Sequence, residues 1–428
     1  MTLAATSPVC SLSEDIDNSP YISTGPVLDR KICEGIRRRM VLECCKWDPQ
    51  VEDVSVLQPF PLLLRRSQWR YLAAQAEALA REVCAAEGAL LERPDLLAEL
   101  AVPRRLAHCI LRGLQSPQSF AADARVMRFD FHPTPTGWRI SEVNSDVPGG
   151  FSEASEFTAM MSEHCYGYVP AGTPGPALAD ALVRTITLHG GGPCALVCAA
   201  GFMEDLQVIS YLANLLRRRG VEAHLGNPRH LRCDRGKLVM EVGSETVPLS
   251  LVVRFHQAEW LSQKSHASIV PYLLGDSDTP VINPGYAMIG ESKRLPLVWD
   301  DLGLEMEAWR RLLPETRDPR EAPWLRDSGW LLKTAFCNTG DSVSSPLTMP
   351  RRQWIRAAAD AMLFPNRWVA QRRFEVLPID TPLGLMYPCI GVYTIAGRAC
   401  GLYGRLSRTP VVTYAAADVT VLVRKETA

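Results

Sequence analysis

The chain has 428 residues, enough for about three domain-sized units, and 47% of them are apolar, which is sufficient for packed cores. Its 46 basic residues balance 47 acidic ones, so no overall charge favours binding to nucleic acid or to a membrane surface. The first residues lack the order of a signal peptide, no apolar run is long enough to span a bilayer, and the 13 cysteines include no Cys-x-x-Cys pair. These features predict a cytoplasmic protein with reduced thiols.

The first part of the chain is predicted to be mostly helical. Residues 1–25 are expected to form a flexible tail, and residues 26–125 a helical region. Apolar residues recur at helical spacing from Ser67 to Cys84, with Ser67 as the predicted N-cap. A second helix is predicted from Pro94 to about Leu100. The buried stripe predicted for the first helix comprises Trp69, Leu72, Ala76, Leu79 and Val83.

Two runs of alternating residues predict a β-hairpin at the start of the segment 126–185. Arg128 and Asp130 share one face of the first run, and Glu142 and Asn144 share one face of the second. A turn rich in proline and glycine joins the runs. Mg²⁺ requires hard oxygen ligands, commonly one or two carboxylates together with substrate phosphates. The hairpin is therefore a candidate Mg²⁺ site; the alternative is an ordinary amphipathic hairpin whose polar face meets water.

The middle of the chain is predicted to be an α/β layer. A helix near residues 152–163 follows the hairpin, and a separate domain covers residues 186–290. In that domain a buried strand over Ala195–Ala199, a helix over Met203–Arg219 and a strand over Val221–Leu225 succeed one another.

The last part of the chain, residues 291–428, has a different pattern. Strand-like runs dominate, and one clear helix is predicted over Arg352–Leu363. This pattern is typical of an antiparallel sheet with a helix. The predicted strands are Trp330–Lys333, Trp368–Gln371, Cys389–Ile395, Leu402–Leu406 and Val419–Val423.

Three basic residues in this part are candidates for binding phosphate. Lys333 ends an apolar strand and precedes a small polar loop with Gly340 as its hinge, as in loops that cover nucleotides in phosphoryl-transfer folds. Lys293 lies in residues 291–296, which are predicted to open a helix, and Arg405 lies on a glycine-flanked strand. The alternatives are a strand-end lysine that extends to solvent, a solvated helix face and an ordinary edge arginine.

Taken together, these motifs resemble the glutathionylspermidine-synthase type of circularly permuted ATP-grasp ligase. The resemblance covers about residues 125–425, and the hairpin is its most specific part. The motifs that carry it are Arg128-x-Asp130, Glu142-x-Asn144, Asn283-Pro-Gly with Lys293, Lys333 with its loop to Gly340, Gln371-Arg-Arg-Phe, and Arg405.

The resemblance implies an α/β (α+β) chain with a circularly permuted ATP-grasp fold, in which the metal ligands precede the nucleotide-binding lysines. It implies that Asp130, Glu142 and Asn144 bind two Mg²⁺ ions that bridge the phosphates of ATP. By the same resemblance, Arg128 holds the transferred phosphoryl group or the acyl phosphate, and Arg405 stabilises charge as an amine attacks.

The same resemblance assigns the nucleotide contacts. Lys293 and Lys333 would contact the phosphates, and Gln371 would lie at the adenine end of the cleft. A shift of one residue would select Ser292 or Arg294 in place of Lys293.

Three departures from the family pattern argue against glutathionylspermidine as the product. Val147 and Gly149 stand where relatives that bind glutathione carry serines, and Asn338 replaces an arginine that helps to hold the acid substrate. No stretch resembles the separate amidase domain of bifunctional relatives. Cys337 could face the cleft and touch substrate, although an incidental cysteine is the simpler interpretation.

The sequence therefore predicts an ATP-dependent ligase that joins a small-molecule or peptide carboxylate to an amine through an acyl phosphate, with release of ADP and phosphate, in a biosynthetic pathway. The partners would be these two substrates, with no nucleic acid and no membrane, and the helical region could pair two subunits in a homodimer. The alternatives are a non-catalytic protein that kept the fold and binds nucleotide, and a phosphotransferase.

Overall fold

The computed structural model describes residues 21–51, 54–113, 124–261, 268–336, 343–413 and 415–426. It is a mixed α/β fold, as predicted, with several separate sheets. Residues 1–20 of the predicted tail lie outside the described residues, whereas β1 (Ile22–Thr24) is a strand that pairs with β4 (Leu62–Leu64).

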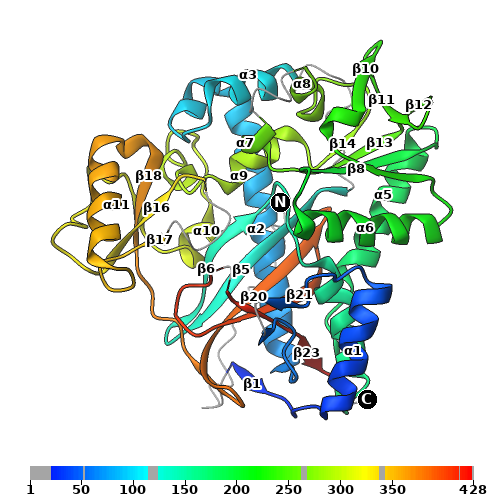
Figure 1. Ribbon diagram of the computed structural model, residues 1–428. Helices are drawn as coiled ribbons and strands as arrows, with labels where there is room; N and C mark the ends of the chain where they lie inside the picture. Colours follow the sequence, from blue (N-terminus) through cyan, green and yellow to red (C-terminus); the bar gives the residue numbers. More distant parts are fainter. Residues whose placement is uncertain are drawn as a thin grey trace, which may run out of the picture.

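The central sheet joins the predicted hairpin to strands from the other end of the chain. Its strands run in the order β22-β21-β20-β5-β6, and β19 pairs with β20. Adjacent strands are antiparallel, and the long-range pairing of β5 with β20 brings the two distant segments together (Figure 1). The strands are β5 (Val126–Thr134), β6 (Gly137–Asn144), β19 (Ile379–Thr381), β20 (Gly384–Ile395), β21 (Arg398–Ser407) and β22 (Ala417–Val419).

The longest helix, α2 (Arg66–Glu92), packs against β20 and β21 of this sheet. Every residue of the predicted apolar stripe is buried, and Phe129 and Phe131 of β5 belong to the same core. The prediction of Ser67 as N-cap is wrong: the helix begins at Arg66, and the N-cap Arg65 makes no capping side-chain bond. The predicted second helix is a 3₁₀ turn over Pro94–Ala98, a form common in pieces too short for a stable α-helix.

A parallel sheet of order β14-β13-β8-β9 forms the predicted α/β layer. The strands are β8 (Cys194–Cys198), β9 (Ala223–Gly226), β13 (Leu251–Phe255) and β14 (Val281–Ile282), and the helices beside them are α5 (Pro174–Leu188) and α6 (Met203–Arg218). A small antiparallel sheet that the sequence did not predict follows β9 in the chain: β10 (Leu231–Asp234), β11 (Lys237–Val242) and β12 (Glu245–Pro248).

The predicted C-terminal strands are divided among three sheets, so the expectation of one antiparallel sheet is wrong. β15 (Thr316–Arg317), β16 (Trp330–Thr334), β17 (Val343–Ser344) and β18 (Trp368–Arg372) form one sheet, which we call the Lys333 sheet, with α11 (Arg351–Leu363) beside it. β20, β21 and β22 instead complete the central sheet. The predicted strand Val419–Val423 is interrupted at Thr420, because β22 joins the central sheet and β23 (Val421–Arg424) joins another sheet. The order in that sheet is β1-β4-β23-β7, where β7 is Tyr168–Pro170.

The Lys333 sheet, the parallel sheet and α2 are joined by shorter helices and strands. In Figure 1 the Lys333 sheet with α11 and the parallel sheet lie on opposite sides of α2. No helix in the described ranges combines the length and apolar character needed to cross a bilayer. The remaining elements are α1 (Arg30–Glu43), β2 (Gln50–Val51), β3 (Val54–Ser55), α3 (Arg104–Gly113), a π-helical turn (Glu153–Phe157), α4 (Thr158–Ser162), β7 (Tyr168–Pro170), α7 (Ala258–Leu261), α8 (Val270–Leu273), α9 (Met288–Glu291) and α10 (Glu307–Leu312).

Candidate functional site

The hairpin β5–β6 brings the four predicted polar residues together. Asp130 lies directly opposite Glu142, and Arg128 lies opposite Asn144. A bulge follows Asp130, where the register shifts by one residue. A bulge of this kind re-aims side chains and is common next to functional sites.

Asp130 is the centre of a buried group of charges. Its carboxylate accepts hydrogen bonds from Arg128 Nε (2.9 Å), Arg405 Nη2 (2.9 Å) and Asn144 Nδ2 (3.2 Å), and only 1% of the residue is exposed. Burial alone would raise the pKa of the Asp130 carboxyl, but Arg128 and Arg405 outweigh it and lower the pKa to about 2. The carboxylate is therefore ionised at any physiological pH.

Arg128 is held in one orientation from several directions. Its guanidinium donates to the carbonyl oxygen of Gly149 at 3.0 Å and lies over the ring of Tyr403, 5.2 Å from the centroid. The Tyr393 hydroxyl donates to the same carbonyl. Gly391 of β20 pairs with Asp130 of β5 and leaves space for the Arg128 side chain. A β-carbon at Gly391 would lie 2.8 Å from Cδ of Arg128.

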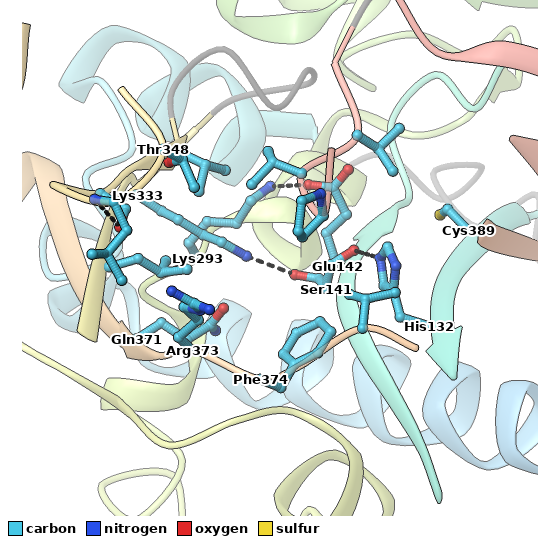
Figure 2. A pocket seen from close by; sticks show the side chains of 18 of the residues that line it. His132, Ser141, Glu142, Lys293, Lys333, Thr348, Gln371, Arg373, Phe374 and Cys389 are labelled. Atoms are coloured by element: carbon cyan, nitrogen blue, oxygen red, sulfur yellow. Dashed lines mark hydrogen bonds and ion pairs between the residues drawn. The ribbon is translucent and has the colours of Figure 1, made fainter. Parts of the chain in front are cut away.

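Two lysines approach the hairpin from outside the central sheet (Figure 2). Lys293 Nζ lies 3.1 Å from Oε2 of Glu142, and Lys333 Nζ donates to the carbonyl oxygen of Ser141 at 3.2 Å. Burial would raise the pKa of the Glu142 carboxyl, but Lys293, with smaller contributions from Lys333 and Arg405, lowers it. Both hairpin carboxylates are thus held in the charged form.

These residues line a cavity of about 470 Å³ between the central sheet and the Lys333 sheet. Glu142, Lys293, Lys333 and Arg405 contribute its charged wall, and Gln371 contributes from β18, where its amide donates to Thr316 Oγ1 at 2.9 Å. Arg373 is a further charged residue of the lining, which also includes the polar residues His132, Ser345 and Thr348. Its apolar side chains are Leu331, Val343, Leu347, Phe374, Val376, Pro410, Val411 and Val412. A cavity lined by both charged and apolar side chains suits a ligand with phosphates and a base.

The donor set of the hairpin fits Mg²⁺ in chemical kind. Two ionised carboxylates and an amide are the hard oxygen ligands this ion prefers, and the remaining positions would be filled by phosphates and water. Within the described ranges no group of three His, Cys, Asp or Glu side chains forms a complete protein cage. The hairpin would therefore bind the ion only in part, together with a phosphate ligand in the adjoining cavity.

The model of the family described as glutathionylspermidine synthase preATP-grasp matches residues 62–424. The chain belongs to this family. The solved structures include the apo form of a glutathione synthetase-like effector, GSS30, from Globodera pallida, which superposes with a TM-score of 0.60 at 11% identity and over 92% of this chain and 97% of that chain. This likeness concerns the fold alone. No curated protein matched.

Membership of the glutathionylspermidine synthase family supports ATP-dependent ligase chemistry in general terms. In this family member, Lys293 rather than Arg294 lines the cavity. Arg294 is buried elsewhere: it donates to the carbonyl oxygens of Glu99 and Trp368 and pairs with Asp318 at 3.0 Å. It therefore fastens the Lys333 sheet to the N-terminal region.

The predicted helix over residues 291–296 is wrong. The helix α9 ends at Glu291, and a 3₁₀ turn, Leu295–Leu297, follows. The segment between them passes close to the Lys333 sheet, where the Lys293 N–H donates to the carbonyl oxygen of Ala335 at 2.8 Å. Gly340 and Cys337 lie outside the described residues.

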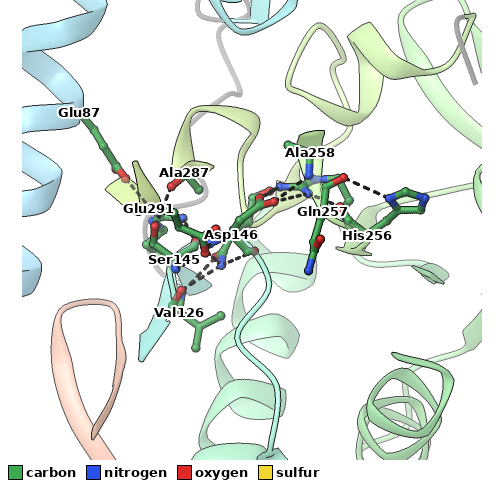
Figure 3. A network of polar contacts seen from close by, with 12 residues as sticks. Glu87, Val126, Ser145, Asp146, His256, Gln257, Ala258, Ala287 and Glu291 are labelled. Atoms are coloured by element: carbon green, nitrogen blue, oxygen red, sulfur yellow. Dashed lines mark hydrogen bonds and ion pairs between the residues drawn. The ribbon is translucent and has the colours of Figure 1, made fainter. Parts of the chain in front are cut away.

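A buried network fixes the end of β6 to the parallel sheet (Figure 3). The Asn283 amide donates to the carbonyl oxygens of Val126, Ser145 and Asp146 at 2.9–3.1 Å, and it accepts from the Val126 N–H. Asp146 pairs with Arg254, which also donates to the carbonyl oxygen of Asn283. The Asn283-Pro-Gly motif is therefore structural: it holds the chain just beyond Asn144.

The cavity lining also includes residues that were not predicted from the sequence, among them His132 and Cys389. His132 follows Asp130 by two positions on the same strand, so the alternation could have found it. Burial, together with Arg405 and Lys333, lowers the pKa of His132 to about 4, so its ring is neutral at pH 7. Cys389 pairs with Arg405 across the sheet, and burial raises the pKa of its thiol to about 12, which leaves it a poor nucleophile.

Proposed function

We propose that this chain is an ATP-dependent carboxylate–amine ligase that forms an amide through an acyl phosphate and releases ADP and phosphate. One observation carries the proposal. The ionised Glu142 lines one cavity together with Arg405, Lys293 and Lys333, and the neighbouring Asp130 pairs with Arg405; apolar side chains form much of the remaining lining. The family match adds support for this class of chemistry.

In this proposal, Asp130, Glu142 and Asn144 would hold Mg²⁺ ions, which would neutralise phosphate charge when bound. Lys293 and Lys333 would bind the phosphates, and Gln371 would lie toward the base. The phosphates would replace the contacts that these lysines now make with Glu142 and Ser141.

Arg128 and Arg405 would act on the reacting groups. Transfer of the γ-phosphoryl group to a carboxylate gives an acyl phosphate, and attack by a neutral amine gives a tetrahedral oxyanion that collapses to the amide with loss of phosphate. Each step concentrates negative charge, and two arginines preorganised by Asp130 are suited to stabilise it. No side-chain nucleophile is required, which agrees with the unreactive thiol of Cys389.

The acid and amine substrates differ, in this proposal, from glutathione and spermidine. Val147 and Gly149 have no hydroxyl, and the carbonyl oxygen of Gly149 already accepts from Arg128 and Tyr393. We propose that residues 126–185 form the metal-binding hairpin with its following helix, residues 186–290 a preATP-grasp-like domain, and residues 291–428 the ATP-grasp region.

The proposal is tested by measuring ADP release with a panel of acids and amines. ADP formation that requires both an acid and an amine, and that falls by orders of magnitude in Asp130→Asn and Glu142→Gln, would support it. Glu307→Gln, at a side chain that is 86% exposed, is the matched control and should behave as wild type. Normal ADP release by both hairpin variants would exclude the site.

Other outcomes identify the alternatives. A product whose mass has increased by one phosphoryl group would indicate a phosphotransferase. Nucleotide binding without turnover on any pair of substrates would indicate a non-catalytic protein.

A further inference from the structure

The ion pair between Lys293 and Glu142 occupies the position at which the proposed function requires a metal. The two side chains are 8% and 17% exposed, and both line the cavity. A buried carboxylate without a counter-charge is strongly unfavourable, so some cation must stay beside Glu142 in every state of the protein. In the structure, the cation closest to Glu142 is Lys293.

We propose that Lys293 and a divalent cation exchange at Glu142, and that this exchange couples metal binding to nucleotide binding. The inference rests on the proposed function. A metal ion at Glu142 displaces the ammonium group, which then needs another anion within reach of the same backbone position. A nucleotide phosphate in the cavity supplies that anion.

The backbone of Lys293 can remain fixed while its side chain changes partner. Its N–H is bonded to the carbonyl oxygen of Ala335, and it is flanked by α9 on one side and the 3₁₀ turn Leu295–Leu297 on the other. Nζ lies near two acceptors, Oε2 of Glu142 at 3.1 Å and the carbonyl oxygen of Glu291 at 3.5 Å. Rotation of the flexible four-carbon stem is therefore sufficient for the exchange.

The coupling follows from comparing the states with one ligand. Metal without nucleotide leaves the Lys293 ammonium buried beside a second positive charge. Nucleotide without metal draws Lys293 away and leaves Glu142, beside phosphate, with only the weaker attraction of Lys333 and Arg405. Of the states with bound ligand, only the doubly occupied one gives both Glu142 and Lys293 a close opposite charge in place of their present ion pair, so each ligand increases the affinity for the other.

The test measures Mn²⁺ affinity by electron paramagnetic resonance, with and without adenylyl imidodiphosphate, in the full-length protein. For Lys293→Met we expect tighter Mn²⁺ binding without nucleotide than in the wild type. We also expect that the nucleotide-dependent gain in Mn²⁺ affinity shrinks by a factor within the usual range of coupling, about 5–150-fold. Mn²⁺ also binds the nucleotide in solution, to the same extent in both experiments. This effect cancels when the nucleotide-dependent gain in Mn²⁺ affinity of the variant is divided by that of the wild type.

Two further variants separate exchange from a general change of charge. Lys293→Arg keeps the cation and should retain most of the coupling. Lys333→Met removes a lysine of the same cavity that donates to a main-chain carbonyl; it should weaken nucleotide binding but raise the nucleotide-free Mn²⁺ affinity less than Lys293→Met does. Equal effects of the two methionine variants, or unchanged coupling in Lys293→Met, would overturn the inference.

Calorimetric titration of the wild type with the nucleotide analogue distinguishes this failure from failure of the proposed function. If the analogue binds with Mg²⁺ and the coupling does not depend on Lys293, only the exchange is refuted. If the analogue does not bind at all, the proposed function is refuted with it.

Discussion

Replacement of Gly391 by alanine should displace Arg128 and reduce activity far more than stability. The new β-carbon would lie 2.8 Å from Cδ and 3.1 Å from Cγ and Nε of Arg128, whereas ordinary contacts begin at 3.4 Å. Arg128 must therefore retreat by roughly half an ångström or more, because Gly391 itself is fixed in the centre of the sheet by its pairing with Asp130. The displacement strains the bonds to the Asp130 carboxylate.

The expected cost in unfolding free energy is about 1–3 kcal/mol, the usual range for overpacking a core. A displacement approaching 1 Å at a residue that positions reacting groups lowers turnover by roughly 10²-fold. Urea denaturation gives the first quantity and initial rates of ADP release give the second. Gly88→Ala is the control: this exposed glycine of α2 has open space around its β-carbon position, so the change should stabilise the helix by about 1 kcal/mol.

A double-mutant cycle decides whether Arg128 is the group that is displaced. In an Arg128→Ala background, the side-chain atoms with which the new β-carbon would clash are absent. Gly391→Ala should therefore cost much less stability there than in the wild type. An equal cost in both backgrounds would refute the reasoning.

Three other predictions concern the charges and the network around the site. Lys46→Met should lower the free energy of unfolding, measured by urea denaturation, by about 3–5 kcal/mol, because it removes the counter-charge of three acids. Lys46 Nζ lies 2.7, 3.4 and 3.5 Å from the carboxylates of Glu153, Asp418 and Asp48. The pKa of Asp130 in the folded protein, about 2, is below its ordinary value of 3.8. The ionised carboxylate should therefore contribute about 2 kcal/mol to the free energy of unfolding above pH 4, and this contribution should be lost as the pH falls from 4 to 2. Across this range, the urea midpoint of Asp130→Asn should fall less steeply than that of the wild type. Asn283→Ala should cost at least about 1–3 kcal/mol, because it leaves buried backbone groups of Val126, Ser145 and Asp146 without partners, and thermal unfolding would measure this loss.

The hairpin could be predicted from the sequence because its information is local. Strict alternation places Arg128 with Asp130 and Glu142 with Asn144, and two runs joined by a short turn must pair with each other. The structure brings these four residues together with Lys293, Lys333, Gln371 and Arg405. Their roles in binding metal and nucleotide remain proposals.

Features that depend on distant pairing were not predictable in this way. Nothing in residues 384–395 indicates that they pair with β5 rather than with β16 or β18, so the sequence pattern alone predicts a single C-terminal sheet. The alternation of residues likewise gives no sign of the bulge after Asp130. A basic pair such as Lys293-Arg294 lies between two short helical turns, where no periodicity tells which side chain enters the cavity.

The most direct test of the account is a crystal structure with Mg²⁺ and a non-hydrolysable ATP analogue. We expect a metal ion about 2.0–2.1 Å from carboxylate oxygens of the β5–β6 hairpin, with the analogue's phosphates beside Lys293 and Lys333 and its base toward Gln371. An analogue bound elsewhere, or bound in the cavity with its metal remote from Asp130 and Glu142, would contradict it.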